Sequence, residues 1–164
     1  MLPQGEFMNI TNKDFKEKRT HPRMPIMHDI IEPINLLCKD RDSDTEVSIP
    51  AILADLSAAG MRLVTFLKVP KGYLDIHLSL PSIGDMHING KTSWIKQKGG
   101  VYTAGIQILE ISKASADKIN KMSEDFNDCD TRILLKLPEV CVENCKANSL
   151  CNKLQKDETL FKKK

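Results

Sequence analysis

Two arginines in a short basic segment are the first residues here with clear chemical potential. Arg19 and Arg23 lie four positions apart in "KEKRTHPR", in a chain with 5 arginines among its 24 basic residues. A guanidinium group binds a phosphate or a guanine edge through two parallel hydrogen bonds, whereas lysine offers a point charge. Pro22 disfavours a regular helix at this point. The segment therefore predicts an arm that binds a planar, anionic ligand, with Lys18 adding to its charge.

A second polar cluster, "DLSAAG", lies where one predicted strand ends and the next begins. Asp55 and Ser57 supply short hydrogen-bond acceptors and one donor. Gly60 allows a tight turn and the close approach of a flat ligand to the backbone. Neither cluster is specific alone, but together they predict one site shared by an arm and a strand end.

The segment between residues 30 and 111 has the pattern of a small β protein. Leu74, Ile76, Leu78 and Leu80 alternate with polar residues, which is typical of a half-buried strand. Short strands separated by glycine, proline and charged turns favour a closed barrel or a sandwich. The expected strands are 30–39, 47–57, 60–66, 73–81, 85–96 and 101–111.

From Ser112 the apolar spacing changes to that of a helix, with Ile119, Met122 and Phe126 on one face. The predicted organisation has five parts. They are an expression scar at 1–7 before a natural start at Met8, a basic arm at 8–28, a barrel at 29–111, a helix at 112–127 and a cysteine-containing extension at 128–164.

These features resemble the PilZ family, whose members are receptors for cyclic di-GMP. The family signatures are Arg-x-x-x-Arg, here "RTHPR", and Asp/Asn-x-Ser-x-x-Gly, here "DLSAAG", and both are complete. The resemblance covers residues 15–126. It implies a mainly β fold: a small six-stranded antiparallel barrel with a flexible N-terminal arm and one or more C-terminal helices.

The resemblance also implies roles for the signature residues. Arg19 and Arg23 would bind the phosphates and guanine edges of cyclic di-GMP, the ligand expected in place of any cofactor. Asp55 would accept hydrogen bonds from guanine N1–H and N2–H₂. Ser57 would add a hydroxyl contact, and Gly60 would allow the ligand to approach.

Three further residues are weaker candidates for ligand contacts. Lys18 adjoins the first arginine, and Trp94 and Gly105 lie on the later predicted strands. Trp94 has a second interpretation as an ordinary core tryptophan.

The function predicted from these features is a switch rather than an enzyme. No nucleophile, phosphate-loop or dinucleotide fingerprint is present in the sequence. The arm would wrap the ligand and change a surface that binds a protein partner. Two alternatives remain open at this point: a PilZ-like adaptor without ligand, and a metal- or redox-responsive regulator that uses the C-terminal cysteines.

The cysteines of the extension are weak metal candidates. Cys129, Cys141, Cys145 and Cys151 are separated by 11, 3 and 5 residues, and only the middle pair has the spacing usual in zinc sites. If the segment were helical, Cys141 and Cys145 would share a face. An odd number of cysteines without an export signal favours reduced thiols.

Composition limits the remaining classes of function. A net charge of +2 is too small to indicate binding of a nucleic-acid polymer. The sequence has no apolar run long enough for membrane insertion, so we expect a cytoplasmic protein.

Overall fold

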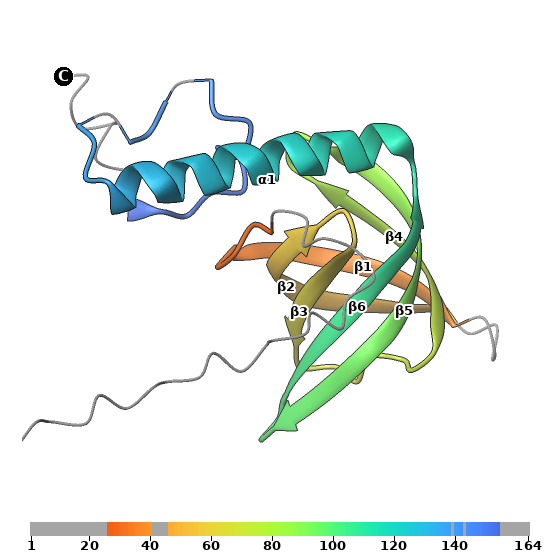
Figure 1. Ribbon diagram of the computed structural model, residues 1–164. Helices are drawn as coiled ribbons and strands as arrows, with labels where there is room; N and C mark the ends of the chain where they lie inside the picture. Colours follow the sequence, from red (N-terminus) through yellow and green to blue (C-terminus); the bar gives the residue numbers. More distant parts are fainter. Residues whose placement is uncertain (1–25, 41–45, 139, 143, 155–164) are drawn as a thin grey trace, which may run out of the picture.

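A computed structural model describes residues 26–40, 46–138, 140–142 and 144–154. Its strands form a closed antiparallel barrel in the order β1-β2-β3-β6-β5-β4, and the predicted six-stranded fold is therefore confirmed (Figure 1). The elements are β1 (Glu32–Asp40), β2 (Glu46–Ser57), β3 (Gly60–Thr65), β4 (Tyr73–Leu80), β5 (Gly84–Lys98), β6 (Val101–Ile111) and α1 (Lys113–Leu134).

The alternating strands place their apolar side chains inside the barrel. Leu74, Ile76, Leu78 and Leu80 of β4 are all buried, as the sequence predicted. Pro33 lies in the part of β1 that pairs with β2 alone, because pairing of β1 with β4 begins only at Leu37. A residue without a backbone N–H is tolerated at such an edge position.

A short segment before β1 is fixed against the end of β2. Met27 and Leu56 exchange backbone hydrogen bonds of 3.0 and 3.2 Å, and Ile30 N–H donates to the Ala54 carbonyl. The register of β2 against β3 shifts between Leu53 and Asp55, which is the signature of a β-bulge. The chain that follows the basic arm therefore lies directly beside the "DLSAAG" segment.

Helix α1 begins where the sequence predicted but ends later. The Ser112 hydroxyl accepts from Ser115 N–H and caps the helix. The predicted end near residue 127 is wrong, since the helix continues to Leu134. Asp128 and Arg132 form an i,i+4 ion pair on this last part, and Lys136, at φ 53°, ends the turn that follows.

The helix lies across one end of the barrel, and residues 140–142 and 144–154 run beside its second half (Figure 1). Ile119, Met122 and Phe126 face the core. Ala147 and Leu150 of the C-terminal segment are also buried in that core. Residues 145–150 form successive turns rather than the helix considered from the sequence.

The thiol of Cys38 in β1 tests whether the barrel interior is shielded from solvent. Its side chain is buried, and desolvation by burial raises the pKa of the thiol from 9.0 to about 11. The thiolate is therefore favoured in the unfolded chain, so stability should fall as pH rises from about 9 to about 11.

We expect the free energy of unfolding of the wild type to drop by about 1 kcal/mol more than that of Cys38→Ala between pH 8 and pH 10. Urea denaturation at the two pH values measures this difference. Equal losses in both proteins would show that Cys38 is not shielded from solvent.

Candidate functional site

An open depression on the outer wall of the barrel brings together every described residue that the sequence predicted for the site. Its volume is about 540 Å³. The predicted residues that line it are Asp55, Ser57, Gly60, Trp94 and Gly105. The other lining residues are Ile26, Ala59, Met61, Arg62, Ser93, Ile106 and Gln107.

Asp55 is held by an arginine that the sequence analysis did not single out. Arg62 faces Asp55 across the β2–β3 ladder. Its Nη2 donates to Asp55 Oδ1 at 3.0 Å, and its Nε lies 2.7 Å from Oδ2. This two-point contact fixes the plane of the carboxylate and places a guanidinium inside the depression.

The hydroxyl of Ser57 organises the turn between β2 and β3. Ser57 Oγ accepts hydrogen bonds from the N–H groups of Ala59 and Gly60, at 3.3 and 3.1 Å. It donates to the Gly60 carbonyl at 3.2 Å. Because this side chain is buried and its donor is used, Ser57 shapes the site through the turn.

Gly60 is required for a different reason from the tight turn predicted for it. The backbone φ of Gly60 is not positive; among the glycines that the structure describes, a positive φ is found at Gly72, Gly84 and Gly99. A Cβ at Gly60 would instead lie 2.8 Å from the Ile106 carbonyl oxygen of β6. The missing side chain allows the two strands to approach.

Trp94 and Gly105 form a unit on the wall of the depression. They are partners across the β5–β6 ladder, next to a register shift between Thr92 and Trp94. A Cβ on Gly105 would lie 2.3 Å from Trp94 Nε1, so the indole rests against the glycine backbone. Trp94 is 41% exposed, and the core interpretation of this residue is therefore wrong.

The arm residues Lys18, Arg19 and Arg23 lie outside the described residues. The description starts at Ile26, which itself lines the depression. Arg62 is the main residue that sequence reasoning missed. Its signal was available, because arginine is rare in this chain and Arg62 follows "DLSAAG" by two positions.

The four C-terminal cysteines line one separate cavity between α1 and the tail, with a volume of about 150 Å³. Burial raises the pKa of Cys129 and of Cys145 above the usual value, although Lys153 partly offsets the effect at Cys129. Within the described ranges, no three Cys, His, Asp or Glu side chains are arranged to hold a metal ion.

No helix in the described part of the chain is both long enough and apolar enough to cross a membrane.

The fold and the site define a six-stranded barrel with an open depression beside the β2–β3 turn, which contains the Asp55–Arg62 ion pair. The PilZ domain family model matches residues 17–125, and the chain belongs to this family. A search of curated proteins found no match.

Several solved structures are similar to this chain at low identity. The Bacillus subtilis inhibitor of motility MotI/DgrA is 15% identical, with a TM-score of 0.49 over 74% of this chain and 55% of its own. Escherichia coli YcgR in complex with c-di-GMP is 16% identical, with a TM-score of 0.47 over 64% of this chain and 46% of its own. The chain thus spans about half the length of these two proteins. The PilZ domain of YcgR with c-di-GMP is 16% identical, with a TM-score of 0.44 over 66% of this chain and 94% of its own.

The contact between Trp94 and Gly105 can be tested with the chain's single tryptophan. In Gly105→Ala the added methyl group must displace the indole, so we expect a clear shift in its fluorescence emission. The stability cost should be about 1 kcal/mol, because the exposed indole can move outward.

Gly100→Ala is the matched control, since a Cβ there meets nothing within 4 Å. Its emission should equal that of the wild type. An unchanged spectrum in Gly105→Ala would contradict the packing described.

Proposed function

We propose that this chain binds cyclic di-GMP in the depression and that Arg19 and Arg23 complete the site. One observation carries the proposal: five residues that the sequence predicts as ligand contacts line a single depression. Ile26 lines it too and follows Arg23 by three residues. Three residues of chain span about 11 Å at most, so the Arg23 side chain can reach the ligand.

The depression offers both kinds of hydrogen-bonding group that guanine needs. Asp55 accepts from guanine N1–H and N2–H₂, since a carboxylate has about four acceptor positions and the Arg62 Nη2 hydrogen bond uses one of them. Arginine is suited to the O6 and N7 edge and to the phosphates. The Arg62 guanidinium contributes fixed positive charge before the arm closes.

The remaining residues give the site its shape. The exposed indole of Trp94 provides a face for base stacking. Gly105 allows the indole to lie flat, and Gly60 keeps β3 close to β6. Ser57 fixes the turn that presents Asp55.

Binding then acts as a switch. The ligand favours the conformation in which the arm lies over the depression, and the free energy available is the ligand's preference for that state. Ordering of the arm changes the surface offered to a protein partner. No step in this scheme requires catalysis.

Isothermal titration calorimetry of cyclic di-GMP into the full chain tests the proposal. The wild type should bind with a Kd in the micromolar range or tighter. Arg23→Ala should weaken binding by about 10-fold to 100-fold, because a charged hydrogen-bonding partner of the ligand is lost.

Arg132→Ala is the matched control, since it removes an arginine paired with Asp128 on α1, outside the depression. Its affinity should equal that of the wild type. Absence of binding by the intact chain would refute the receptor function and favour the ligand-free adaptor. An equal loss in both variants would show a nonspecific charge effect.

A further inference from the structure

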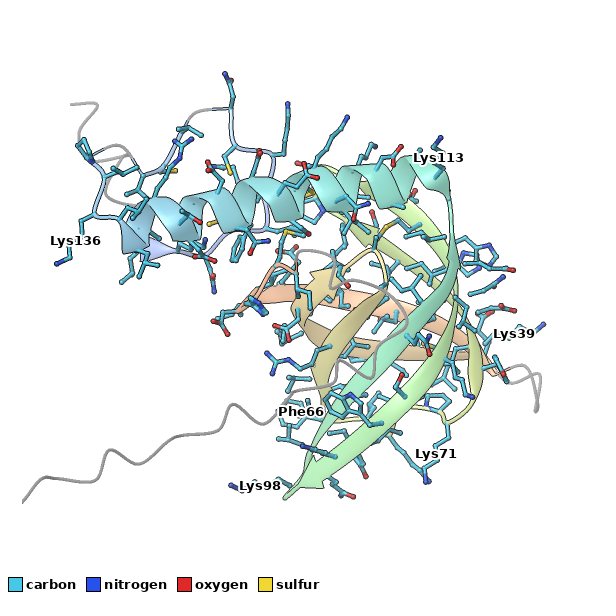
Figure 2. The ribbon with its side chains drawn as sticks, viewed as in Figure 1. Lys39, Phe66, Lys71, Lys98, Lys113 and Lys136 are labelled. Atoms are coloured by element: carbon cyan, nitrogen blue, oxygen red, sulfur yellow. The ribbon has the colours of Figure 1, made fainter. Side chains whose placement is uncertain are left out.

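The loop between β3 and β4 presents two apolar side chains to solvent at the end of the barrel opposite α1 (Figures 1 and 2). Phe66 is 79% exposed and Leu67 is 44% exposed. They are consecutive in the sequence and follow directly after β3. Exposed apolar residues are common singly, but an adjacent aromatic and aliphatic pair at a loop tip is a candidate contact surface.

This loop is braced against the barrel. Val69 is buried and anchors the loop in the barrel end. Leu67 N–H donates to Thr65 Oγ1 at 3.2 Å, and Thr65 Oγ1 donates to the Pro50 carbonyl at 2.7 Å. Thr92 of β5 donates its hydroxyl to the Pro70 carbonyl at 2.7 Å. The loop is therefore held in a conformation that keeps Phe66 directed outward.

Exposed lysines lie around the two apolar side chains. Lys68 and Lys71 are on the loop itself, and Lys96 and Lys98 are at the end of β5. The register places these ends together: Thr65 is opposite Tyr102 on β6, and Tyr102 is opposite Gln97 on β5. Figure 2 shows Phe66, Lys71 and Lys98 at this end of the barrel.

The only acidic residue within ten positions of these four lysines in the sequence is Asp75, four positions after Lys71. Residues 56–74 and 86–109 contain no Asp or Glu. None of the four lysines has an ion-pair partner in the described part of the chain. Lys96 instead lies 5.7 Å from the centre of the Trp94 ring.

We propose that this lysine-rimmed loop, formed by Phe66, Leu67, Lys68, Lys71, Lys96 and Lys98, docks peripherally on an anionic membrane surface. The apolar pair would enter the headgroup region while the lysines remain at the level of the lipid phosphates. The proposal does not depend on nucleotide binding.

The use of lysine rather than arginine on this surface favours a membrane over a protein partner. Lysine is depleted in protein–protein interfaces, where arginine is enriched. All basic residues of this surface are lysines, and the neighbouring Arg62 is held by Asp55. The basic arm of this chain and a second copy of this surface are the other possible occupants. Both carry positive charge, so the lysines of the loop would repel them.

Sedimentation of the full chain with phosphatidylcholine vesicles, with and without phosphatidylglycerol, tests the proposal. We expect binding only to the anionic vesicles, and weaker binding as salt increases. Lys68→Gln with Lys71→Gln should reduce the partition coefficient about 25-fold. Phe66→Ser with Leu67→Ser should reduce it about 10-fold or more.

Two control variants match these changes on the opposite side of the molecule. Lys113→Gln with Lys136→Gln removes the same charge, from the first residue of α1 and from the turn that follows its last residue (Figure 2). Leu134→Ser with Leu135→Ser removes two side chains that are 81% and 63% exposed.

Both controls should bind like the wild type. Equal binding to neutral vesicles, equal losses in the controls, or no binding to anionic vesicles would overturn the proposal. The last result would assign this surface to an acidic protein instead.

Discussion

The closure of the barrel is the constraint on which the rest of this structure depends. Pairing of β1 with both β2 and β4 completes the ring and fixes the register of every strand. That register places Gly60 opposite Gln107, and Gly105 opposite both Arg62 and Trp94. The depression is therefore built from the rigid wall of the barrel, and the short segment at 26–30 joins it through hydrogen bonds to β2.

The sequence predicted the strands well because each one carries the alternation that a one-sided core requires. Details that depend on the pairing of one strand with another could not be predicted from the sequence. The contact of Arg62 with Asp55 requires the β2–β3 register, and the exposure of Trp94 follows a register shift in β5. The sequence predicted the apolar face of α1 but not the end of the helix. The last two turns of α1 pack beside the tail and do not continue the buried apolar stripe. The convergence of four cysteines on one cavity depends on how the tail folds back beside α1, which spacing alone does not reveal.

The Asp55–Arg62 pair links the architecture to the proposed switch. Its side chains are 22% and 41% exposed, so the pair contributes about 1 kcal/mol or less to folding. Its main effect is to hold the Asp55 carboxylate in one orientation, so that this side chain is already ordered before a guanine binds. Preorganisation of this kind lowers the cost of binding and leaves more of the ligand's binding free energy for closing the arm.

A crystal structure of the full chain grown with cyclic di-GMP tests the central claim most directly. We expect a guanine edge on Asp55, a base against Trp94, and Arg19 and Arg23 in contact with the nucleotide. A nucleotide bound elsewhere, or bound in the depression without either arginine, would contradict it.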